Sequence, residues 1–119
     1  MPKFGCRCGH TISLVVSPSL HEASLIFDPD FDELCNRRTA AVDAFLAAVR
    51  NGKRDEWVTE FYGRPPFGIS DGSIIDDIIT REDEFSLLIV ICPECGRLYR
   101  QRKHGENEYD CYIPEPDGE

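Results

Sequence analysis

The chain contains 119 residues, 41% of them hydrophobic and 29% charged, a composition that excludes a disordered polymer and suits a single globular domain over residues 1–119. Its net charge of −9 disfavours nucleic acid and anionic membranes as partners and favours a basic protein, because opposite charges attract. The sequence begins without an apolar run of signal-peptide length, and its longest apolar stretch, Leu87 to Cys92, is too short to span a bilayer. We therefore expect a cytoplasmic protein.

The N-terminal residues are expected to form two strands joined by a cysteine-containing turn. Residues 3–16 show this pattern, since the segment from Thr11 to Val16 is rich in β-branched and apolar side chains. A further short strand is expected at Leu25 to Phe27, where Asp28-Pro29 would end it. The chain is therefore expected to begin as β-structure.

Three helices are expected in the middle of the chain. The longest covers Asp30 to Arg50, with Asp30 as its N-cap and Glu33 three residues later, as in a capping box. Apolar residues recur along it at helical spacing. Shorter helices are expected at Asp55 to Tyr62 and at Ser73 to Arg81.

The C-terminal third is expected to return to β-structure. Phe85 to Ile91 is apolar in its centre without alternation, which predicts a strand buried on both faces. Leu98 to Lys103 and Glu108 to Ile113 are expected to form a hairpin around a turn at residues 104–107. Residues 114–119 form an acidic tail.

Two short cysteine motifs carry the clearest chemical signal. The second knuckle, Cys92-Pro93-Glu94-Cys95-Gly96, has the spacing that lets two sulfurs face one ion, and its glycine permits the turn. The first knuckle, Cys6-Arg7-Cys8-Gly9-His10, is a version with one intervening residue instead of two. Structural zinc sites commonly use four thiolates. We therefore expect Cys6, Cys8, Cys92 and Cys95 to hold one structural Zn²⁺.

Several alternatives to this site remain open from the sequence. The four thiols could be free, bridged as disulfides, or bound to iron in a four-thiolate site. His10 could replace one cysteine, and Cys111 could be an alternate ligand, although Cys111 and Cys35 fit core positions. Four cysteine ligands leave no open position for a catalytic water, so we expect no catalytic residues and no enzyme activity.

The two cysteine motifs also carry a family resemblance. A Cys-Gly near the start and a late Cys-Pro-x-Cys-Gly-Arg-Leu-Tyr segment, Cys92 to Tyr99, resemble small bacterial zinc-ribbon proteins. The resemblance covers residues 3–16 and 86–113. It implies an α+β fold, in which a zinc-ribbon-like antiparallel β-sheet carries a mainly helical insertion at residues 17–85 between the knuckles. The short first knuckle and the long separation depart from the family pattern.

A zinc-stabilised protein-interaction module is the function that these features favour. The protein loosely resembles immunity proteins, which neutralise a partner toxin, in its small size, its acidity and its lack of catalytic groups. The alternative is a nucleic-acid-binding or transcription-associated zinc ribbon that uses the basic residues of Arg97 to Lys103. Pairing of these cations with Glu106, Glu108 and Asp110 would instead make them structural.

Overall fold

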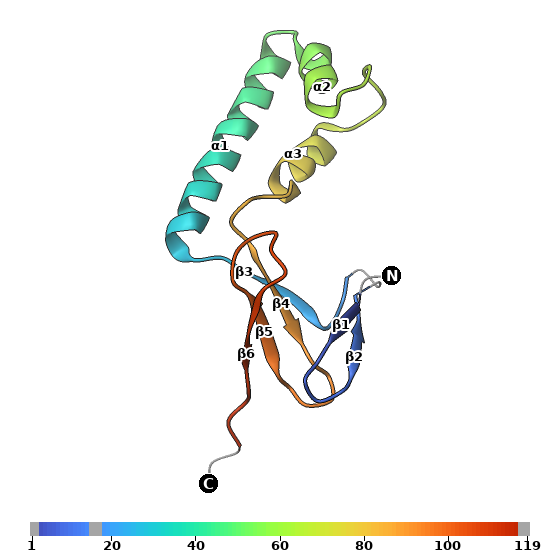
Figure 1. The fold of residues 1–119 in the computed structure, drawn as a ribbon. Helices are drawn as coiled ribbons and strands as arrows, with labels where there is room; N and C mark the ends of the chain where they lie inside the picture. Colours follow the sequence, from blue (N-terminus) through green and yellow to red (C-terminus); the bar gives the residue numbers. More distant parts are fainter. Residues whose placement is uncertain (1–2, 15–17, 117–119) are drawn as a thin grey trace. The chain divides into compact units, whose positions relative to one another are not determined.

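The computed structural model describes residues 3–14 and 18–116, which form two compact units (Figure 1). The β unit combines the two ends of the chain, Met1–Phe27 and Glu84–Glu119, and the helical unit comprises Asp28–Asp83. Among the described residues, no helix has the length and apolar character needed to cross a membrane. The fold is therefore α+β, with a helical insertion between the two cysteine knuckles, as the sequence predicts.

Within residues 3–14, 18–27 and 84–116, the β unit contains two antiparallel sheets. One has two strands and the other has four strands in the order β3-β4-β5-β6. The strands are β1 (Lys3–Gly5), β2 (Thr11–Ser13), β3 (Glu22–Leu25), β4 (Leu87–Ile91), β5 (Leu98–Gln101) and β6 (Tyr109–Tyr112). Because β3 pairs with β4, a segment before the helices is joined to one after them.

The core of the β unit includes two of the cysteines. Its buried residues are Cys6, Ile12, Val90, Cys92 and Tyr99. The Phe4 ring lies against the Tyr99 ring, with 4.8 Å between their centroids. Since these side chains come from β1, β2, β4 and β5 and from both knuckles, the core and the cysteines share one packed interior.

The helical unit has a separate core. Its helices are α1 (Asp28–Arg50), α2 (Arg54–Tyr62) and α3 (Asp71–Thr80). Phe45, Val58, Ile74 and Ile78 are buried together and come from all three helices. Burial of these apolar side chains removes them from water and stabilises the unit.

Local signals explain where the helices begin and end. Ser70 caps α3, since its side-chain oxygen accepts a hydrogen bond from the Ser73 N–H at 3.1 Å. Gly63 follows α2 in the left-handed conformation, with φ 66°. Because Ser70 is its cap, α3 starts at Asp71, two residues before the predicted start at Ser73.

Two sequence predictions about local structure are wrong. The long helix begins at Asp28, so Asp30 lies inside it and is not its cap, and the predicted capping box does not form. Pro29 sits in the first turn, where its fixed φ suits a helix and its missing N–H costs nothing. The strand expected at Leu25 to Phe27 is β3, which lies earlier because it pairs with β4.

The predicted boundaries of the larger segments need refinement. The helical unit starts and ends inside the predicted insertion of residues 17–85, and β3 belongs to the β unit. Residues 15 and 16 of the expected second strand, and residues 117–119 of the acidic tail, lie outside the described residues. That the two units make a single domain stays a prediction.

Candidate metal centre

The first knuckle is the turn between β1 and β2. The Cys6 N–H donates to the His10 carbonyl and the Gly9 N–H donates to the Cys6 carbonyl, both at 2.9 Å. Gly9 has φ 98°, a region that other residues rarely adopt. These contacts fold Cys6 and Cys8 into one tight loop.

The second knuckle is the turn between β4 and β5, and its backbone closes in a similar way. The Cys92 N–H donates to the Arg97 carbonyl and the Gly96 N–H donates to the Cys92 carbonyl, both at 2.9 Å. Gly96 has φ 76°. Each hydrogen bond spans one more residue than its counterpart in the first knuckle. The sequence difference between Cys-x-Cys and Cys-x-x-Cys thus changes the loop length and keeps the closing hydrogen bonds.

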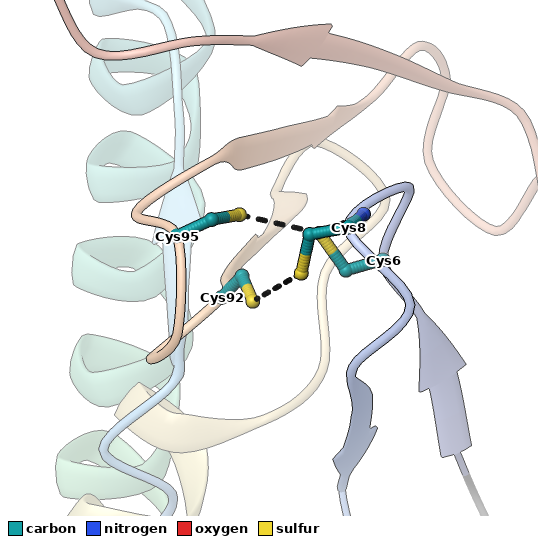
Figure 2. A group of neighbouring side chains, drawn as sticks. All are labelled: Cys6, Cys8, Cys92 and Cys95. Atoms are coloured by element: carbon teal, nitrogen blue, oxygen red, sulfur yellow. Dashed lines mark hydrogen bonds between the residues drawn. The ribbon is translucent and has the colours of Figure 1, made fainter.

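The two knuckles meet and bring four sulfurs together (Figure 2). Cys6 Sγ lies 3.5 Å from Cys95 Sγ, and Cys8 Sγ lies 3.7 Å from Cys92 Sγ. The four sulfurs lie within 4.8 Å of one another. In a tetrahedral zinc site, Zn–S bonds of about 2.3 Å place the sulfurs about 3.8 Å apart. The spacing therefore fits a four-thiolate ion and far exceeds the ~2.05 Å of a disulfide.

The four cysteines differ in their exposure to solvent. Cys6 and Cys92 are buried, Cys95 is half-buried and Cys8 is exposed. The site thus has a buried side in the β-unit core and one ligand position at the surface.

The pKa values of Cys6 and Cys8 diverge. Burial acts to raise the pKa of Cys6, but hydrogen bonds from the Cys8 N–H, the Tyr99 hydroxyl and neighbouring thiols lower it to about 6. For Cys8, the His10 N–H acts to lower the pKa, whereas the Cys6 sulfur, burial and the other thiols raise it to about 12. Ionisation of several neighbouring thiols is unfavourable because the thiolates repel one another. A divalent ion would relieve this repulsion.

Arg97 supplies positive charge beside the cluster. Its backbone N–H, and also its guanidinium, lower the pKa of Cys95. In turn, the hydrogen bond to Cys95 raises the pKa of Arg97. Four thiolates around a Zn²⁺ ion would carry a net charge of about −2, which a neighbouring guanidinium would stabilise.

Tyr99 contacts the first knuckle from β5. Its hydroxyl donates to Cys6 Sγ at 3.3 Å and accepts a hydrogen bond from the Arg7 N–H at 2.9 Å. The side chain is buried, and burial is the main cause that raises its pKa to about 12. The sequence did not predict this role, because nothing local connects residues 92 or 93 positions apart. Its presence in the Cys-Gly-Arg-Leu-Tyr segment was the one available signal.

The other candidate ligands lie outside the sulfur cluster. Across residues 3–14 and 18–116, the group that could hold an ion contains neither His10 nor Cys111. Cys111 packs against the β-unit core. Cys35 is half-buried on α1 in the helical unit. The site thus consists of the four cysteines predicted as ligands, while their binding of a metal stays a prediction.

Two of the basic residues after the second knuckle, Arg100 and Arg102, are paired with acidic side chains. Asp110 accepts hydrogen bonds from Arg100 and Arg102, each at 2.9 Å. Glu108 lies 3.4 Å from Arg102. These arginines lower the pKa of Asp110, Arg100 having the largest effect. The cross-strand pairing predicted as the structural alternative is therefore confirmed for Glu108 and Asp110.

Comparison with known proteins places the chain in a family. A family model described as "Domain of unknown function (DUF8617)" matches residues 2–116. The match covers nearly the whole chain, so the chain belongs to this family. No curated protein and no solved structure matches it. The family description names neither a zinc ribbon nor an immunity protein, and the function is therefore argued from the site.

Proposed function

We propose that this protein is a small zinc-binding module in which one Zn²⁺, held by Cys6, Cys8, Cys92 and Cys95, is structural. The observation that carries the proposal is the approach of four sulfurs to within 4.8 Å. Soft thiolate donors in a set of four select zinc over calcium or magnesium. The ion would join two hairpins whose cysteines are 84 and 89 positions apart. It would thereby stabilise the fold of the β unit.

The module acts by binding a partner, and it is not an enzyme. Four cysteine ligands complete the tetrahedron, so the zinc has no open position for water or substrate. The net charge of −9 favours a basic protein as the partner, through faster electrostatic encounter. In the more specific form of the proposal, that partner is a toxin that this chain neutralises, and both proteins meet in the cytoplasm, where thiols stay reduced.

Nucleic-acid binding is the second candidate, and the structure gives it little support. Arg100 and Arg102 would have to leave Asp110 in order to contact phosphates. The acidic net charge opposes the same contact.

Affinity capture from native lysate, with and without nuclease, tests the mode of action. Wild-type protein loaded with zinc is the bait, and Cys92→Ser, which lacks one ligand, is the matched control. A basic protein retained at fixed stoichiometry by wild type after nuclease treatment, and lost with Cys92→Ser, is the expected result. Retained material that disappears with nuclease would contradict a protein partner. A steep linear fall of log affinity with log salt concentration, measured with the nuclease-sensitive material, would then support the nucleic-acid candidate.

A further inference from the structure

The first knuckle is the shorter of the two, and a side chain from β5 contacts it in addition to its own backbone hydrogen bonds. With one residue between its cysteines, its loop is one residue shorter than that of the second knuckle. Its two sulfurs face Cys95 and Cys92 on the opposite loop, at 3.5 and 3.7 Å. A small rotation of this loop would therefore move both sulfurs away from the ion.

Tyr99 spans the distance between the two knuckles. Its backbone lies in β5, directly after the second knuckle, where it pairs with Val90 and Cys111. Its hydroxyl reaches the first knuckle, where it contacts the Arg7 N–H at 2.9 Å and Cys6 Sγ at 3.3 Å. One side chain thus fixes the loop backbone and a ligand sulfur together.

The Tyr99 ring is held so that the hydroxyl has little freedom. Its relative exposure is 5%, and the Phe4 ring packs against it at 4.8 Å. A buried and packed ring loses little further entropy when its hydroxyl forms hydrogen bonds. The packed ring therefore holds its hydroxyl in position for both contacts at little entropic cost.

We propose that Tyr99 is a positioning residue for the metal, whose hydroxyl holds Cys6 and the first knuckle in the geometry that the ion requires. This inference rests on the proposed zinc site. A hydrogen bond to a ligand atom orients that ligand, and its loss typically weakens metal binding about 10- to 100-fold. Tyr99→Phe keeps the ring and removes both hydrogen bonds, so we expect zinc affinity to fall by at least about tenfold.

The experiment measures zinc affinity by chelator competition and records the thiolate-to-metal charge-transfer band of the Co²⁺-loaded protein. An O–H···S hydrogen bond lowers the energy of the sulfur lone pair, so its loss in Tyr99→Phe is expected to move the band to longer wavelength. Tyr109→Phe is the control, since the Tyr109 ring also packs against Phe4, at 5.0 Å. We expect its affinity and spectrum to match those of wild type.

The outcomes separate this inference from the proposed function. Wild type that binds no zinc would overturn the zinc site itself. Wild type that binds zinc, with unchanged affinity and spectrum in Tyr99→Phe, would overturn the role of Tyr99 alone. If Tyr99→Phe does not fold, wild type labelled with 3-fluorotyrosine replaces it. Fluorination makes the phenol a stronger donor, so the band should move to shorter wavelength, and an unmoved band would refute the inference.

Discussion

Removing one exposed ligand gives the sharpest test of a structural zinc. Cys8 is exposed, so Cys8→Ser removes a thiolate and leaves the packed core of the β unit unchanged. In the proposed site, the ion would join Cys8 to Cys92, which is 84 positions away. A cross-link that closes a loop of this length stabilises the folded state by about 4–5 kcal/mol in the chain-entropy account. Small domains are stable by only about 5–15 kcal/mol, so the loss should leave the β unit marginal.

Urea unfolding and amide hydrogen exchange measure this effect. We expect Cys8→Ser to lose zinc, so its free energy of unfolding should approach that of wild type stripped of metal with a chelator. Exchange protection should fall in the strands of the β unit and persist in the helical unit, whose core is separate. Fluorescence of Trp57, the single tryptophan, reports on the helical unit.

Cys35→Ser is the matched control, because Cys35 is a thiol of the helical unit outside the cluster. It should retain zinc and the stability of the β unit. A metal-free Cys8→Ser protein that unfolds at the same urea concentration as zinc-loaded wild type would refute a structural role for the ion.

Three further predictions address the ion, the core and a turn. Zinc binding must release the Cys8 proton, since its pKa is about 12, so apparent affinity should rise at least about tenfold per pH unit between pH 7 and 8. Cys6 has a pKa of about 6, so below pH 6 it also becomes protonated, and zinc affinity should depend on pH more steeply there. An affinity that stays constant from pH 5 to 8 in a chelator titration would contradict this. Phe45→Ala should destabilise the helical unit by about 3–5 kcal/mol in urea unfolding, because Phe45 is fully buried, and a cost below about 1 kcal/mol would show that the core is wrongly described. Gly96→Ala should cost about 1–2 kcal/mol in thermal unfolding, since φ is 76° and the added Cβ would lie 3.1 Å from Pro114 Cγ; an unchanged melting curve would show that the turn relaxes.

The cysteine cluster was predictable because its signals are local. Cys92 and Cys95 are spaced to face one ion, and the glycine after each pair marks the turn. Because a structural zinc ion takes four ligands, two such cysteine pairs are expected to meet at one ion. The pairing of Cys6 with Cys95 and of Cys8 with Cys92 was not predictable, since it depends on how two distant hairpins approach each other.

Features that depend on tertiary contacts were mislocated or missed. The position of β3 follows from its pairing with β4, more than 60 residues away in the chain, and propensity alone moved it to Leu25–Phe27. The start of α1 at Asp28 was missed because Asp30 and Glu33 mimic a capping box inside a helix that Pro29 already begins. The contact of Tyr99 with Cys6 required the completed fold.

Metal analysis of the purified protein tests the central claim most directly. The protein is purified without chelator under reducing conditions and examined by native mass spectrometry and elemental analysis, with Cys8→Ser alongside. The account predicts one zinc per wild-type chain, with weaker retention in Cys8→Ser. Iron at the same stoichiometry would contradict the identity of the metal. Four freely alkylated thiols with no bound metal would contradict the metal centre itself.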